Sequence, residues 1–196
     1  MTYPAWHLPV TGGYIGGIAN QADGPDVLFL PGAGTSAGTW APVFDQLAEL
    51  HVVALDRRGV AQSIDAPVLE DWAAWRDAVH VIESMFLERP VLVGHNSGAT
   101  IALTVATERP DLVSAVVALD TVAPSADNPM SFAQPEGVRV VSADEAERRR
   151  SPHPDVRVVC VEGGHRAHHS YPDDVAAIIR SVTEAGAYAF SARARA

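Results

Sequence analysis

The chain has 196 residues, of which 47% are hydrophobic and 19% are charged, proportions typical of one globular domain. A net charge of -10 without a stripe of lysine and arginine argues against a nucleic-acid or anionic-membrane partner. The single cysteine excludes an internal disulfide, and the lack of a long apolar run or of a signal-peptide layout predicts a cytoplasmic protein.

Strand-like and helix-like segments alternate along the chain. Residues 5–10 and 13–21 are predicted to form an antiparallel pair, joined through Gly12 and Gly13. The later strands are apolar without alternation, which is typical of strands covered on both faces. They are predicted within DVLFLPGAG, HVVALDRRG, PVLVGHNSG, LVSAVVALDTVAP, VRVVSADEAERRR and VRVVCVEGGHRAHH.

Between these strands, apolar residues recur at helical spacing. Helices are predicted within GTWAPVFDQLAEL, LEDWAAWRDAVHVIESMFLER, ATIALTVATE and YPDDVAAIIRSVTEAG, the second being the longest and the last ending at Gly186. The alternation predicts an α/β fold, a doubly wound and mostly parallel sheet with helices on both faces. Residues 1–186 are predicted to form a single domain, and residues 187–196 a frayed tail.

Ligands bind such sheets at the carboxyl ends of the strands. Four predicted strand ends carry unusual residues: LPGAG, LDRRG, GHNSG and EGGH. Their order, together with the LD that ends at Asp120, resembles the α/β-hydrolase family from about Val10 to Ala185. In that family a nucleophile elbow reads Gly-x-nucleophile-x-Gly. Gly94 and Gly98 match its two glycines, which puts Asn96 at the nucleophile position.

A second segment, ALDRRGVAQS, resembles the family stretch Asp-x-Arg-Gly-x-Gly-x-Ser. Asp56, Arg58, Gly59 and Ser63 match that pattern, whereas Ala61 stands where a glycine is usual. We interpret this segment as structural, tying a loop near the elbow.

The resemblance also implies roles for the other predicted strand ends. The two oxyanion donors would be the backbone N–H groups of Ala33 and Ser97. The catalytic histidine would be His165, in EGGH. The acid that orients it would be Asp120, after the sixth strand, or Asp144, after the seventh; Asp120 is favoured because the glycine usual before the later acid is missing.

His168 and His169 follow closely after His165. They are predicted to be solvated loop histidines, since no cysteine or carboxylate cluster joins them to complete a ligand set. The sequence therefore predicts no metal and no cofactor. Only residues 120–137 separate the sixth predicted strand from the next, so the resemblance implies a site without the usual helical cap, open to a small-molecule or carrier-bound substrate.

An amide is not a nucleophile, so Asn96 leaves several functions open. The first is an esterase or thioesterase scaffold in which Asn96 replaces serine and impairs hydrolysis. A lyase or cyclase is the second, with His165 as general base and Asn96 as a hydrogen-bonding group. A non-catalytic small-molecule-binding protein is the third, and an epoxide hydrolase or dehalogenase relative whose aspartate became Asn96 is the fourth. Serine is favoured as the replaced residue, because such aspartate enzymes use a cap and often have tryptophan where Ser97 stands.

Overall fold

The computed structural model describes residues 3–68, 73–119, 157–161 and 167–193. Seven strands in these ranges form one mixed sheet in the order β1-β2-β4-β3-β5-β6-β7. The strands are β1 (Ala5–Val10), β2 (Gly13–Ala19), β3 (Asp26–Leu30), β4 (His51–Leu55), β5 (Val91–His95), β6 (Ala115–Leu119) and β7 (Arg157–Val161). The β1–β2 and β2–β4 pairs are antiparallel and all the others are parallel, as the sequence predicts for a doubly wound sheet.

The helices lie on both faces of this sheet. The α-helices are α1 (Ala41–Phe44), α2 (Trp75–Ser84), α3 (Ser97–Glu108), α5 (Ala167–Ser170) and α6 (Pro172–Arg193). Short 3-10 helices in the described residues include η1 (Ala37–Trp40), η2 (Ala61–Ser63) and η4 (Pro110–Leu112). Within the described part of the chain, no helix is both long and apolar enough to cross a membrane.

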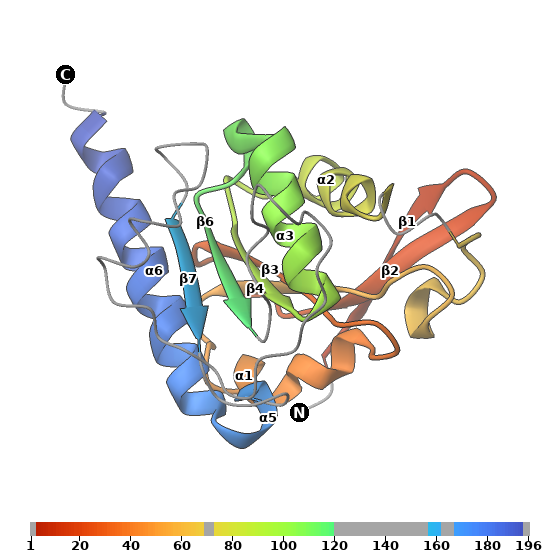
Figure 1. Ribbon diagram of the computed structural model, residues 1–196, viewed down its shortest axis with the longest axis horizontal. Coiled ribbons are helices and arrows are strands. Elements are labelled where there is room, and N and C mark those ends of the chain that lie inside the picture. Colours follow the sequence, from red (N-terminus) through yellow and green to blue (C-terminus); the bar gives the residue numbers. More distant parts are fainter. Residues whose placement is uncertain (1–2, 69–72, 120–156, 162–166, 194–196) are drawn as a thin grey trace, which may run out of the picture.

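Successive side chains of a strand point to opposite faces of the sheet, so the core has two parts. Along β3, Leu28 and Leu30 pack with α2 and α3 on one face, whereas Val27 and Phe29 pack with α1 and α6 on the other. All four side chains are buried, which explains why this strand shows no polar alternation. Figure 1 shows α2 and α3 together on one side and α6 running beside β7.

Three of the helix predictions differ from the structure. The helix predicted within residues 38–50 is only η1 followed by the single turn α1, because the chain after Phe44 continues in turns with i to i−3 hydrogen bonds. The helix predicted within residues 69–89 is α2, Trp75–Ser84, in the described part of that range. It ends before Phe86 and Arg89, because both of these residues have positive φ.

The prediction that the last helix ends at Gly186 is wrong, because α6 continues to Arg193. A single glycine costs a helix only about 1 kcal/mol relative to alanine, and the alanine-rich segment after it favours helix. The strand predicted within VRVVSADEAERRR lies outside the described residues, whereas the one predicted within VRVVCVEGGHRAHH is β7, paired in parallel with β6.

Candidate active site

The turn between β5 and α3 has an unusual backbone conformation. Asn96 has φ 51° and ψ -119°, a region that residues other than glycine seldom occupy. Hydrogen bonds hold it on both sides: its N–H donates to the Leu119 carbonyl at 2.9 Å, and its own carbonyl accepts from the Ala99 N–H at 3.0 Å. A sharp, clamped turn of this kind displays the side chain at its apex, which is what a nucleophile elbow requires.

The two glycines around Asn96 are required by close backbone contacts. A Cβ atom on Gly94 would lie 2.4 Å from the Ala99 Cα, and a Cβ atom on Gly98 would lie 2.0 Å from the Leu30 carbonyl oxygen. Neither position can hold a larger side chain without moving the backbone. The spacing of the glycines in GHNSG therefore has a steric cause in the packing of α3 against β3 and β5.

The two N–H groups predicted to be oxyanion donors lie beside the elbow, and both of them already have acceptors. The Ser97 N–H donates to the Asn96 side-chain oxygen Oδ1 at 2.7 Å. The Ala33 N–H donates to the Ser97 hydroxyl oxygen at 2.9 Å. Ser97 thus connects the loop after β3 to the elbow, and a substrate oxygen would have to replace these two side-chain acceptors.

The remaining predicted site residues, His165, Asp120 and Asp144, lie outside the described residues. The strands that precede two of them are described. β6 ends at Leu119, directly before Asp120, and Leu119 pairs with His95, the residue before Asn96. The structure therefore brings Asn96, Ala33 and Ser97 together, while the roles of the histidine and the acid stay predictions.

A cluster of aromatic rings, the histidine stack, adjoins the elbow and was not predicted. The ring of His168 lies 4.6 Å from each of the rings of His95, Trp40 and His169, measured between centroids. His168 is 2% exposed, so the prediction that it is a solvated loop histidine is wrong. It is buried because α5 packs against η1, where Thr39 Oγ1 is hydrogen-bonded to Nε2 of His168 and of His169.

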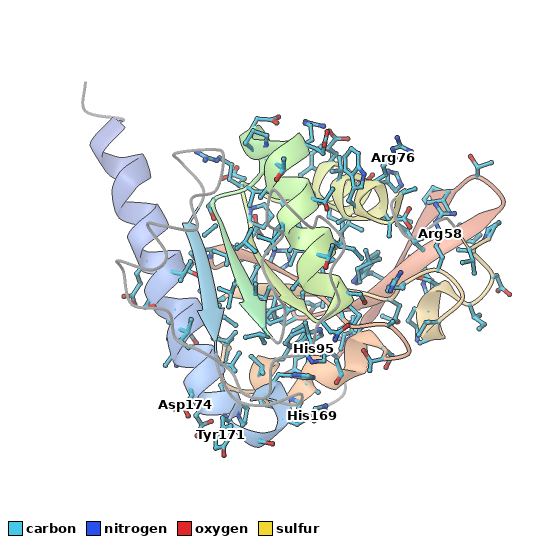
Figure 2. The ribbon with its side chains drawn as sticks, viewed as in Figure 1. Arg58, Arg76, His95, His169, Tyr171 and Asp174 are labelled. Carbon is cyan, nitrogen blue, oxygen red and sulfur yellow. The ribbon has the colours of Figure 1, made fainter. Side chains whose placement is uncertain are left out.

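The histidine stack lies at the carboxyl end of the sheet. Figure 2 labels His95, the last residue of β5, and His169 of α5, and the ring of His168 lies between them in the stack. Residues 39 and 168 are 129 positions apart in the sequence, so spacing within the chain carries no signal for this contact. The only local hint is the pair of adjacent histidines after EGGH.

Hydrogen bonds tie the segment ALDRRGVAQS to η1 and to β2, in agreement with its interpretation as structural. The buried carboxylate of Asp56 accepts hydrogen bonds from the backbone N–H of Ala37 at 2.5 Å and of Gln62 at 3.1 Å. Burial raises the pKa of the Asp56 carboxyl above its ordinary value, against these two hydrogen bonds. The Ser63 hydroxyl donates to the Asp56 carbonyl at 2.8 Å and accepts from the Gly16 N–H at 2.8 Å.

Ala61, the departure from the family pattern, is left-handed with φ 40°. The Ala61→Gly variant is expected to be more stable by about 0.5 kcal/mol, because the left-handed conformation costs an alanine about 1–2 kcal/mol and the freedom of glycine in the unfolded chain offsets part of that gain. Urea denaturation measures the change. Ala74→Gly is the control, since Ala74 has φ -61° and should lose stability. Equal losses in both variants would contradict the prediction.

A pocket opens next to the elbow on the side of α2 and α3. Its cavity volume is about 40 Å³, in a hollow that is partly open to solvent, and it is lined by Leu30, Pro31, Leu55, Arg57, Arg58, Val68, Ala74, Asp77 and Ile101. Arg57 joins it to the elbow, because its Nη1 donates to the Ser97 hydroxyl oxygen at 3.2 Å. The pocket therefore combines a mostly apolar wall with the Arg57 guanidinium, which reaches the elbow.

Comparison with known sequences agrees with this geometry. The sequence profile of the α/β-hydrolase fold matches residues 25–185. The (E)-2-((N-methylformamido)methylene)succinate hydrolase of Acinetobacter baylyi is 33% identical over 107 residues, which cover 52% of this chain and 40% of that protein. An epoxide hydrolase of Caballeronia sordidicola is 32% identical over 107 residues, which cover 52% of this chain and 32% of that one. The matched stretch spans less than half the length of either relative.

Solved structures give the same result for the fold. A haloalkane dehalogenase variant from Bradyrhizobium elkanii aligns with a TM-score of 0.67 over 99% of both chains at 17% identity. An epoxide hydrolase from an endophytic Streptomyces aligns with a TM-score of 0.56 at 28% identity, over 63% of this chain and 38% of that one. The family profile covers most of the chain, and the elbow and the sheet order agree with it: the protein belongs to the α/β-hydrolase fold family, and the relatives named here are hydrolases.

Proposed function

We propose that the protein is a hydrolase scaffold of the ester or thioester class in which Asn96 occupies the position of a serine nucleophile, so that covalent hydrolysis is impaired. The observation that carries this proposal is the backbone of Asn96, held at φ 51° and ψ -119° with the N–H groups of Ala33 and Ser97 beside it. This is the geometry of an elbow that presents a nucleophile. A side-chain amide cannot be activated by a histidine at neutral pH, so it does not attack a carbonyl carbon.

The hydrogen bonds around Asn96 support the impairment. Its Oδ1 accepts from the Ser97 N–H, one of the two groups proposed to stabilise an oxyanion. A serine hydroxyl is shorter by one heavy atom and would leave that N–H to the substrate. Asn96 therefore removes the nucleophile and also occupies one of the donors on which the transition state depends.

In an active form of this scaffold, a serine hydroxyl at position 96 would lose its proton to His165 and attack the carbonyl carbon of the ester. Asp120, or alternatively Asp144, would orient the histidine. The negative charge on the tetrahedral intermediate would be stabilised by the N–H groups of Ala33 and Ser97. His165 would then return the proton to the leaving alcohol or thiol, and water would release the acyl group by the same route.

The pocket beside Arg57 supports a substrate class. Arg57 reaches the Ser97 hydroxyl, and the other walls are mostly apolar, so we propose a small or carrier-bound acyl compound with a negatively charged group. The name of the Acinetobacter baylyi relative describes a substrate with carboxylates, which is consistent with this class. We further propose that the site is open and minimally capped, because the segment at 120–137 is short. The net charge of -10 supports a cytoplasmic protein without a nucleic-acid or membrane partner.

The proposal is tested by the Asn96→Ser variant. It is expected to hydrolyse a p-nitrophenyl ester faster than the native protein by about two orders of magnitude or more, since a complete triad exceeds the residual catalysis of its surroundings by at least that factor. Asn96→Ala is the control and should gain nothing. Adding His165→Ala to the serine variant should remove the gain. A serine variant no faster than the alanine variant would refute the proposal.

The epoxide hydrolases among the relatives favour one second candidate, in which Asn96 replaces an aspartate. Asn96→Asp keeps the shape of the side chain and supplies a carboxylate nucleophile. Opening of styrene oxide by this variant, together with an inactive Asn96→Ser variant, would select the epoxide-type scaffold. The opposite pair of results would select the ester type.

A further inference from the structure

We propose that Asn96 is a self-modifying residue: the backbone nitrogen of Ser97 attacks the Asn96 side-chain carbon Cγ, and the resulting succinimide hydrolyses to leave an acidic residue at position 96. This reaction uses only the chain and water. It concerns the same elbow as the proposed function but rests on backbone geometry rather than on any hydrolytic activity.

The carrying observation is the ψ of Asn96, -119°. Viewed along the Cα–C bond of an L residue, Cβ lies about 120° away from the residue's own backbone nitrogen. With ψ at -119°, the dihedral angle from Asn96 Cβ to the Ser97 nitrogen is therefore close to zero, so the two atoms are eclipsed. A succinimide ring consists of that nitrogen and the Asn96 atoms C, Cα, Cβ and Cγ. The ring is close to planar, so this eclipsed arrangement is the one that its closure requires.

The side chain is also turned to the correct side. Asn96 Oδ1 lies 2.7 Å from the Ser97 nitrogen, so Cγ, which is bonded to that oxygen, faces the same nitrogen. Ser97 is the first residue of α3, a position at which the N–H has no carbonyl acceptor within the helix. Its proton is therefore not held by the α-helical hydrogen bonds that protect amides further along.

The fold holds this arrangement in place. The Asn96 N–H donates to Leu119 in β6, and the Asn96 carbonyl accepts from Ala99 in α3. An unfolded Asn-Ser sequence seldom visits positive φ with this ψ, because most of the backbone map at positive φ is closed to residues with a Cβ atom. The conformation that displays a nucleophile is thus also the reactive conformation for an asparagine at the same position.

The chemistry balances without any co-reactant but water. A base removes the Ser97 N–H proton, the nitrogen bonds to Cγ, and the amide nitrogen of Asn96 leaves as ammonia. Water then adds to one of the two ring carbonyls. Cleavage of the new bond to Cγ yields aspartate, and cleavage of the original peptide bond to nitrogen yields isoaspartate. Asn96 and Ser97 are both half-buried, so water reaches the ring. The aspartate product carries a carboxylate, which can act as a nucleophile where the amide cannot.

The experiment compares the folded and the unfolded chain. The full-length protein is incubated at mildly alkaline pH in buffered ¹⁸O-labelled water, with and without denaturing urea, and digested for peptide mass spectrometry. Conversion at position 96 is expected to be about tenfold faster in the folded protein, the factor gained when one residue's backbone is already fixed. Each acidic product should carry one ¹⁸O atom. A folded backbone ordinarily slows succinimide formation at asparagine, so faster conversion in the folded than in the unfolded chain would be specific to the elbow.

Two other asparagines serve as internal controls. The Asn20 side chain donates to the Leu50 carbonyl and accepts from the Val52 N–H, and Asn128 precedes a proline, which has no N–H proton to lose. Both should remain amides in the folded protein. If Asn96 converts more slowly in the folded than in the unfolded chain, the inference is overturned. The mass measurement is independent of esterase activity. If the Asn96→Ser variant is active and Asn96 of the native protein does not convert, only this inference is rejected. If Asn96 converts rapidly and the Asn96→Ser variant is inactive, only the proposed function is rejected.

Discussion

The Gly98→Ala variant is expected not to fold, or to lose most of its stability. Gly98 is the second residue of α3, and the new Cβ atom would lie 2.0 Å from the backbone carbonyl oxygen of Leu30 and 2.8 Å from that of Pro31. Both contacts are with backbone in or directly after β3, at the centre of the sheet, so no side-chain rotation relieves them. Moving α3 away would open the core on that face, which places the expected loss at about 4 kcal/mol or more.

The stability of this variant is measured by urea denaturation followed by far-ultraviolet circular dichroism. Gly38→Ala is the matched control, because its Cβ atom would meet only the Ser36 hydroxyl oxygen at an ordinary distance of 3.5 Å. The control should be neutral or stabilised by up to about 1 kcal/mol, since alanine restricts the unfolded chain more than glycine does. A Gly98→Ala protein as stable as the control would show that α3 does not pack this closely on β3.

The Asp77→Ala variant should cost about 2–3 kcal/mol of unfolding free energy, because it leaves the Arg58 guanidinium without its carboxylate in a mostly enclosed place. Arg58 donates to both oxygens of Asp77, at 2.8 Å and 2.9 Å, and each side chain is only 11% exposed. Asp77 also holds the pKa of Arg58 above its ordinary value through these hydrogen bonds. The pair lines the pocket, so the same variant should loosen the part of the pocket wall that Arg58 and Asp77 form.

A double-mutant cycle with Arg58→Ala isolates the interaction between the two side chains. The exposed pair Arg109 and Asp111 provides the control, since it has a similar double hydrogen bond but is open to solvent. Asp111→Ala should change stability far less, because water screens the exposed pair. Equal losses from Asp77→Ala and Asp111→Ala would mean that burial does not strengthen the inner pair.

The glycine pattern of the elbow is visible in the sequence, although its two glycines have different causes. Gly94 is crowded by Gly98 and Ala99 of the same turn, whereas Gly98 is crowded by the Leu30 carbonyl of the distant strand β3. The strands were also visible, since side chains buried on both faces leave an unbroken apolar run such as that of β3. Together with the other strand-end motifs that resemble the α/β-hydrolase family, GHNSG identified Asn96 as the residue at the apex.

The length of a helix was less visible, because it depends on packing as well as propensity. The apolar spacing of residues 38–50 is real, and Trp40, Phe44 and Leu47 are all buried, but turns rather than a continuous helix deliver them to the core. At the other end of the chain, α6 continues through Gly186, where the sequence predicts a stop. Neither difference changes the order of the elements or the face that each one covers.

The sequence by itself indicated the strands and the elbow with Asn96 at its apex, because strands buried on both faces leave unbroken apolar runs and the elbow leaves a recognisable glycine spacing. Only the tertiary structure decided what surrounds that residue: the Ala33 N–H on the Ser97 hydroxyl, 64 residues away, and His168 buried against His95 and Trp40. Contacts between such distant residues depend on how the helices and loops pack on the sheet, and neither periodicity nor spacing encodes that packing. The ψ of Asn96 depends on both the sequence and the tertiary structure. The glycines of the sequence permit the sharp turn, and hydrogen bonds to β6 and α3 hold the turn in place.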